Sequence, residues 1–312
     1  MLTGVSITAA QGRYAGASME LGIGARPLAL GGAAAALNST GETFFYNPSS
    51  LGLLKKPHIN FMYAPTFGSF AEPMAHYNYV GGAYPMQGGG TIAFNWTRFA
   101  VDEIPVYPDL KGESFAERNK DLSLRPDGTA LGYIEDVEDV FYFSFAKTLE
   151  SILPLGWWYG DLPMTIPFGI NFKLLRQKLG DASASGMGID AGMMIKFNLG
   201  TLVNQRQLGD MSFGLSLLDM TKTAVIWDTK HEDNIRQTLM FGISYMQPLW
   251  FSDASLNTYY TYHQKYEIKH FIGIEFAVRG VAVRLGKNEA GLTTGAGIHW
   301  RRVFVDYAFA NN

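Results

Sequence analysis

The feature that most constrains the fold is an alternation of apolar residues with small or polar residues along most of the chain. Between Thr165 and Lys173 apolar residues occupy every second position, and Gly186–Asn198, Met211–Leu217 and Leu292–Trp300 repeat the pattern. Successive side chains of a β-strand point to opposite faces, so a period of two predicts strands with one apolar face. The spacings of three and four residues that indicate helices are almost absent.

About thirteen segments of this kind follow one another, joined by short links such as Lys265–Glu267. Short links predict an antiparallel meander, because parallel strands need long crossover connections. Most segments approach the ~9–11 residues that a tilted membrane strand requires. Because bacterial barrels of this type have an even number of strands, we predict about fourteen.

The composition indicates where the apolar faces point. Charged residues make up 17% of the chain, against roughly 25% in typical soluble domains. The longest apolar run, Leu28–Leu37, is about half of the ~18–20 residues that a membrane helix needs. The second face of the strands is mostly Gly, Ala, Ser, Thr and Asn, which suits a confined interior. We therefore predict an all-β transmembrane antiparallel barrel; the alternative is a soluble all-β protein whose apolar faces form a core.

Several classes of function are disfavoured by the sequence. The net charge is 25 − 28 = −3, without the basic excess of a nucleic-acid binder. There is no cysteine, the six histidines lack metal-ligand spacing, and no G-x-S-x-G, H-E-x-x-H or Walker A sequence occurs. We expect a non-enzymatic protein without a metal or cofactor.

The predicted interior carries charges of both signs. Charges in a barrel interior need a partner or water. We expect them to pair across a closed interior, the alternative being an open polar permeation path. These predicted lumen charges are Lys173, Asp190, Lys196, Lys269, Glu275, Arg284, Arg301 and Asp306.

Two regions depart from the alternation. Residues 1–57 are rich in glycine and alanine, which permit close backbone packing, so we predict a plug segment ahead of a barrel at 58–312. A plain N-terminal extension is the alternative. Val101–Glu138 carries prolines and many charges, and we predict a long extracellular loop there, as the best candidate for a partner contact.

Two blocks of the N-terminal segment resemble a known family. Leu21–Ala33 reads LGIGARPLALGGA and Phe45–Leu51 reads FYNPSSL. Both resemble the PorV/PorQ family of outer-membrane barrels, which is related to the long-chain fatty-acid transporters. Phe213–Leu217, Thr238–Tyr245 and Val305–Phe309 also look like strands of this family. Family members usually carry an acidic pair and an N-P-A-G sequence, where this chain has STGE and NPSS.

The resemblance implies a fourteen-stranded barrel in the bacterial outer membrane. Because such a protein must be exported, we expect its signal peptide to have been removed already. It implies that the plug is built on the residues that match the family blocks, namely Gly24, Arg26, Gly31, Gly32, Tyr46, Asn47 and Pro48.

Two roles follow from the resemblance. One is an accessory subunit of type IX secretion or of another surface assembly, with outer-membrane lipid and other proteins as partners. The other is uptake of hydrophobic small molecules such as fatty acids, with Phe44, Phe45 and Tyr46 lining a pocket near the plug. A purely structural barrel that anchors something else at the surface is a third hypothesis.

Overall fold

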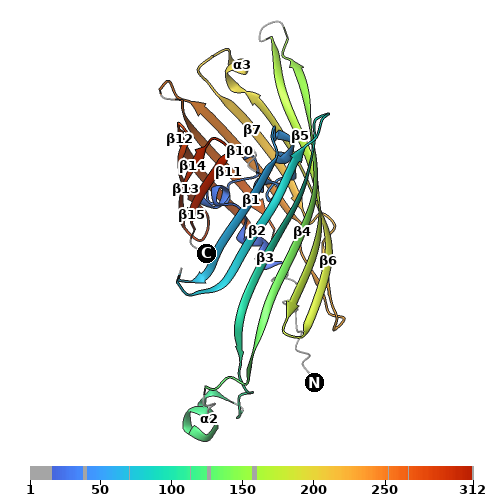
Figure 1. Cartoon of the computed structure of the whole chain (residues 1–312), viewed down its shortest axis with the longest axis vertical. Coiled ribbons are helices and arrows are strands. Elements are labelled where there is room, and N and C mark those ends of the chain that lie inside the picture. The colour runs from blue at the N-terminus through green and yellow to red at the C-terminus, as the bar shows by residue number, and fades with distance from the viewer. Residues whose placement is uncertain are drawn as a thin grey trace, which may run out of the picture.

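The computed structural model describes residues 16–37, 41–69, 71–112, 114–124, 128–156, 160–251, 253–265 and 267–310. In these residues the chain forms one large antiparallel sheet of 15 strands with a few short helices (Figure 1). The predicted all-β antiparallel class is confirmed. Of the predicted plug segment, residues 1–15 and 38–40 lie outside the described part.

The strands follow the sequence, each bonded to its neighbour along the chain except around β8 and β9. They are β1 (His58–Gly68), β2 (Pro73–Pro85), β3 (Gly90–Val106), β4 (Gly132–Pro154), β5 (Asp161–Leu179), β6 (Ala182–Asn198), β7 (Asp210–Leu218), β8 (Ala224–Trp227), β9 (Glu232–Asn234), β10 (Thr238–Pro248), β11 (Ala254–Gln264), β12 (Ile268–Val278), β13 (Val281–Lys287), β14 (Leu292–Trp300) and β15 (Val303–Phe309).

The helices are short. The 3₁₀ helices are η1 (Ala17–Leu21), η2 (Glu42–Phe45), η3 (Pro48–Leu53) and η4 (Leu122–Leu124), and the α-helices are α1 (Ala25–Ala29), α2 (Phe115–Lys120) and α3 (Leu199–Val203). None of the helices in the described part of the chain has the length and apolar character needed to cross a membrane.

Two details differ from the prediction. The sheet of the described residues has 15 strands rather than about fourteen: 13 lie on the main path, and the short strands β8 and β9 lie off it, with β8 paired to β6. The predicted loop Val101–Glu138 is strand at both ends, since β3 and β4 stay paired out to Val106 and Gly132 past a bulge. The connection itself is residues 107–131 and carries α2 and η4.

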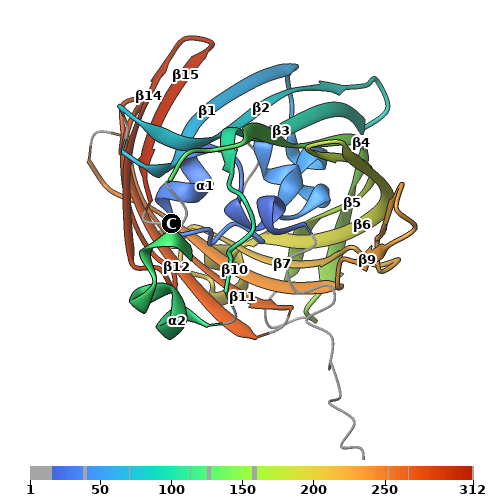
Figure 2. The same ribbon diagram turned by 90° about the horizontal axis from the view of Figure 1, so that it is seen from below.

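The sheet curls around the N-terminal segment, so that β1 and β15 approach each other (Figure 2). The rings of His58 and Phe304, one at the start of each of these strands, lie 6.2 Å apart between centroids.

The connections between successive strands of this antiparallel sheet alternate between its two ends. We call the end with the β1–β2, β3–β4, β5–β6, β7–β10, β11–β12 and β13–β14 connections the arm end. There β3 and β4 project furthest, carrying α2 (Figure 1).

The two faces of the curled sheet have a polarity opposite to that of a water-soluble fold. Large apolar side chains such as Phe61 (77% exposed), Ile170 (46%) and Val283 (53%) cover the outer face. The inner face instead buries polar side chains, among them Asn171 and Thr261, both 0% exposed. The alternation thus produces an apolar exterior and a polar interior.

Candidate functional site: the N-terminal segment and its cavity

The N-terminal segment lies inside the curl of the sheet, where its helices fill the centre (Figure 2). Its apolar residues Ile23, Leu30, Leu37 and Leu51 are fully buried and form the hydrophobic core together with strand residues such as Tyr142. The core of this protein is therefore built between a short irregular segment and the wall, and not between two layers of sheet.

Glycines on the inner face let the backbone of this segment touch the wall. At Gly242 an added Cβ would lie 2.6 Å from the Ala36 amide nitrogen, and at Gly273 it would lie 2.7 Å from the Leu30 carbonyl oxygen. Real Cβ atoms are not found so close to other atoms, so a side chain here would push the segment away from the wall. Six strands contribute to this glycine row, with Gly169, Gly192, Gly214, Gly242, Gly273 and Gly286.

Hydroxyl and amide side chains of the wall satisfy the backbone of the segment. Ser216 Oγ donates to the Tyr46 carbonyl at 2.7 Å, and Ser244 Oγ donates to the Ala36 carbonyl at 2.9 Å. Thr148, Asn171 and Thr293 donate to the carbonyls of Gly52, Phe44 and Ala29 in the same way. An irregular segment can be buried only if its polar backbone groups find partners, and the small polar residues of the strands supply them.

The residues of the second family-like block hold the segment together. The Asn47 side chain is fully buried: its Oδ1 accepts from the Ser49 amide at 3.1 Å, and its Nδ2 donates to the Ala35 carbonyl at 2.7 Å. Tyr46 donates its hydroxyl to the Ile23 carbonyl, and burial raises the pKa of this phenol, which keeps it protonated as a donor. Pro48 opens η3, where its missing N–H costs nothing.

The first block supplies turns and one charge. Gly24, Gly31 and Gly32 have φ of 84°, 70° and 86°, a backbone region in which other residues are strained. Arg26 on α1 donates from both Nε and Nη2 to the Glu275 carboxylate, each at 2.8 Å. This bidentate pair ties the segment to β12.

The Arg26–Glu275 pair belongs to a larger cluster of predicted lumen charges. Arg284 Nε lies 2.6 Å from Glu275 Oε2, and its Nη1 lies 2.5 Å from Asp306 Oδ1. Two arginines and two carboxylates make this cluster electrically balanced, which offsets the cost of burying it.

A second buried cluster surrounds Lys173. Its Nζ lies 2.8 Å from Asp190 Oδ1 and 2.6 Å from Asp219 Oδ1. Asp219 is not among the predicted lumen charges, because it follows the end of β7 and its position depends on the turn after that strand. Asn171 was not predicted either, although it shares a face with Lys173 and hydrogen-bonds Asp190 at 3.2 Å. That shared face was the available signal.

The remaining predicted lumen charges are less buried. Lys196 pairs with Asp210 at 3.1 Å and Lys269 with Glu289 at 3.5 Å, both on the inner face near the ends of their strands. Arg301 differs from the prediction: it lies in the exposed turn between β14 and β15, over the Trp300 ring. β14 ends at Trp300, so the alternation cannot be extended to it.

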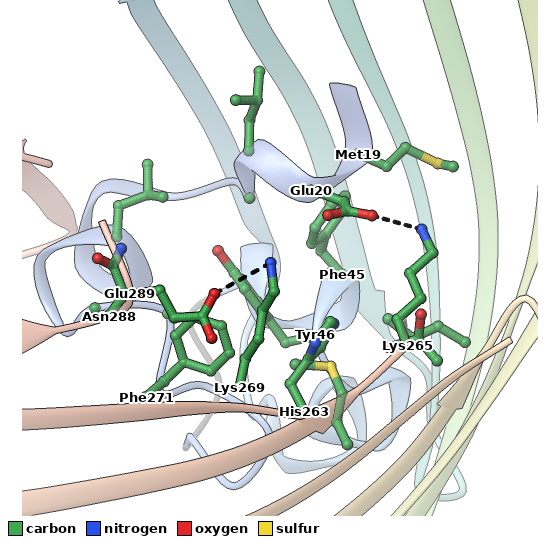
Figure 3. Close-up of a pocket in the computed structure, with 18 of the residues that line it drawn as sticks. Met19, Glu20, Phe45, Tyr46, His263, Lys265, Lys269, Phe271, Asn288 and Glu289 are labelled. Atoms are coloured by element: carbon green, nitrogen blue, oxygen red, sulfur yellow. Dashed lines mark hydrogen bonds and ion pairs between the residues drawn. The ribbon is translucent and has the colours of Figure 1, made fainter. Parts of the chain in front are cut away.

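A cavity of about 580 Å³ lies between the N-terminal segment and strands β10–β12 (Figure 3). Its walls are largely apolar, with Met19, Phe45 and Phe271 facing the space. Two ion pairs border it, Lys265 with Glu20 at 2.8 Å and Lys269 with Glu289. These lysines flank the β11–β12 connection, which places this border of the cavity at the arm end.

The three predicted pocket residues take two positions. Phe45 and Tyr46 line the cavity. Phe44 points away into the core, where its ring packs 5.2 Å from Tyr142 and 6.2 Å from Tyr79.

Among the described residues no group of three or more His, Asp or Glu side chains is arranged to hold a metal ion. Comparison with known protein families, with curated proteins and with solved structures finds nothing that matches this chain.

Proposed function

We propose that this protein is an outer-membrane β-barrel that acts as a non-enzymatic subunit of a secretion or surface assembly, of the type IX accessory kind. The observation that carries this proposal is the reversed polarity of the sheet. An exterior of residues such as Phe61, Ile170 and Val283 would be unfavourable in water and is favourable against acyl chains.

A barrel requires the edges of the sheet to close. In lipid every backbone N–H and C=O needs a partner, so β1 and β15 must be satisfied along the line where they meet. The approach of His58 and Phe304 supports closure at this seam.

The filled interior favours a role other than a pore. The glycine row and the wall hydroxyls bring the N-terminal segment into direct contact with the strands. The Arg26 and Lys173 clusters add buried ion pairs whose rupture would leave charges unpaired, at a cost of about 3–5 kcal/mol each. We therefore propose a plug that stays in place while the protein works.

A projecting arm favours a protein partner. We define the β3–β4 arm as residues 104–134, the outermost part of these strands with the connection between them (Figure 1). Five large apolar side chains in its described part are more than half exposed, namely those of Tyr107, Leu110, Phe115, Leu131 and Tyr133. Apolar side chains gathered on a projection away from the membrane belt are typical of an interaction site.

The test is purification of the tagged chain from its native membranes in mild detergent. We expect other proteins to co-purify with the wild type and to be lost from the triple variant Leu110→Ser, Phe115→Ser, Leu131→Ser. Trp250→Ser is the matched control, since Trp250 is 95% exposed in the β10–β11 connection at the opposite end. A triple variant that retains every partner would show that the arm is not the contact, and a wild type that purifies alone would contradict the assembly role.

A second candidate function is uptake of a hydrophobic small molecule. The cavity favours it, because about 580 Å³ bordered by Phe45, Tyr46 and Phe271 matches the usual size and lining of small-molecule sites. Mass spectrometry of the purified protein would then detect a co-purifying amphiphile. Phe45→Ala, which removes a wall of the cavity, should release it, whereas Phe115→Ala on the arm should not.

A further inference from the structure

One row of outward-facing residues crosses five strands in register near the arm end. Arg98 on β3 lies opposite Asp139 on β4, which lies opposite Arg176 on β5. The row continues to Ser185 on β6 and Ile226 on β8. Four of its five residues are polar, on a face that is largely apolar.

The neighbouring row toward the middle of the strands is entirely apolar. It consists of Trp96, Phe141, Leu174 and Met187, again opposite one another on β3 to β6. Rows on one face are two residues apart, about 6.6 Å along a strand. The outer face thus changes from apolar to charged within one such step, which marks the edge of the proposed membrane belt at the arm end.

Some of the charged side chains in and beside this row form ion pairs and others do not. Arg98 holds Asp139 through Nη2 at 2.7 Å and Nε at 2.8 Å, and Trp96 Nε1 donates to the same carboxylate at 2.7 Å. In contrast, neither Arg176 nor Lys178, one step further out on β5, forms an ion pair with any described residue. Both side chains are exposed.

Arg176 and Lys178 line a surface hollow of about 680 Å³ under the β8–β9 hairpin. Ile226, which is 56% exposed, forms an apolar side of it. Of its three carboxylates, Asp139 is held by Arg98, and Asp228 accepts from the amide and hydroxyl of Ser183 at 3.0 and 3.2 Å. The third, Glu135, lies four residues beyond Asp139 along β4, on the side away from the apolar belt.

We propose that this hollow binds the phosphate head group of an anionic lipid in the membrane leaflet on the arm side. The Arg176 guanidinium donates two parallel hydrogen bonds to phosphate oxygens, Lys178 adds a point charge, and Ile226 contacts the lipid backbone. The inference rests on the proposed membrane location, because only a belt edge at the Trp96 row brings head groups to this depth.

The experiment compares the wild type with Arg176→Gln/Lys178→Gln. Each protein is reconstituted in nanodiscs of neutral phosphatidylcholine and of phosphatidylcholine mixed with phosphatidylglycerol, and the lipids retained after detergent release are identified by native mass spectrometry. The matched control, Lys111→Gln/Lys120→Gln, removes the same charge from exposed positions of the β3–β4 arm, far from the belt.

We expect the wild type and the control to retain phosphatidylglycerol selectively, and the hollow variant to lose about tenfold or more of this preference, given about 1 kcal/mol for each cation near the surface. Arg176→Lys keeps the charge and loses the two parallel hydrogen bonds, so we expect it to retain a preference between those of the wild type and the hollow variant. Equal retention of both lipids by the wild type would overturn the inference. It would also be overturned if millimolar inorganic phosphate displaced no phosphatidylglycerol from the wild type and the hollow variant kept its preference for this lipid. A chain that fails to insert into neutral nanodiscs would instead contradict the membrane proposal itself.

Discussion

At the scale of single residues, the family-like blocks of the N-terminal segment have structural explanations. Glycines occupy positions of positive φ, Arg26 reaches across to Glu275, and Asn47 joins η3 to the turn at Ala35. None of these contacts needs a ligand. The blocks therefore specify how an irregular segment is folded and held inside the sheet.

Asn47→Ala should destabilise the protein more than any exposed asparagine. The change removes the η3 cap and the bond to Ala35, and it leaves buried backbone groups without partners. We expect a loss of about 2–4 kcal/mol in the free energy of unfolding, measured by urea titration in detergent. Asn234→Ala, at an exposed side chain, should change it by less than about 0.5 kcal/mol; similar values for the two variants would contradict this account.

The glycine row gives a second test. Gly242→Ala places a Cβ against the Ala36 amide, whereas Gly82→Ala, in β2, meets only the His58 carbonyl oxygen at 3.7 Å. We expect Gly242→Ala to lower the thermal unfolding midpoint or prevent folding, since backbone cannot yield as a side chain can. Gly82→Ala should fold like the wild type. Equal midpoints would mean that the N-terminal segment does not lie in tight contact with the wall at Gly242.

At the scale of elements, β3 and β4 stay paired beyond the part of each strand that has an apolar outer face. Both strands remain paired well past the apolar rows, through a bulge between Val101 and Ile104, and end in a connection in which no residue of α2 is buried. The β3–β4 arm is thus an extension of the hairpin that contributes little to the core.

Replacing residues 107–131 by a short turn should therefore leave the folded protein intact. Because no side chain of α2 packs on the sheet, we expect the thermal midpoint in detergent to fall by no more than a few degrees, as followed by circular dichroism. A variant that removes the shorter stretch 41–54 is the contrast, since the side chains of these residues are nearly all buried, and it should not fold. Loss of folding in the arm deletion would show that the arm packs in the native state.

At the scale of the whole molecule, the two faces of the sheet have the reverse of the polarity found in a soluble protein. Its apolar residues lie outside, its polar residues line the interior, and the interior is filled by the N-terminal segment. This arrangement is the basis of the membrane proposal.

The proposal predicts that equally exposed residues respond differently to charge. The side chains of Ile170 on the outer face of β5 and Leu110 on the β3–β4 arm are both exposed, at 46% and 60%, so we compare Ile170→Arg with Leu110→Arg. In lipid bilayers we expect Ile170→Arg to cost about 2–4 kcal/mol of folding free energy and Leu110→Arg to cost almost nothing. Equal and small effects, measured by reversible unfolding in vesicles, would refute the membrane location.

Local pattern accounts for most of what could be predicted. A period of two is a property of neighbouring residues, so the alternation around Ile170 indicated a strand before any partner was known. It did not give the full length of β3 and β4, whose outer parts lack a clear apolar face. It also missed β8 and β9, which are four and three residues long, because β8 depends on pairing with β6 and β9 on pairing with β8.

The sequence by itself determined that this chain forms antiparallel strands with one apolar and one polar face, because side-chain direction alternates along any extended backbone. Only the tertiary structure decided which charges meet. Asp219 joins Lys173 through a turn, Arg26 reaches Glu275 across 249 positions of the chain, and Arg301 falls beyond the end of its strand. Such contacts depend on curvature and register summed over many strands, and no short stretch of sequence encodes them.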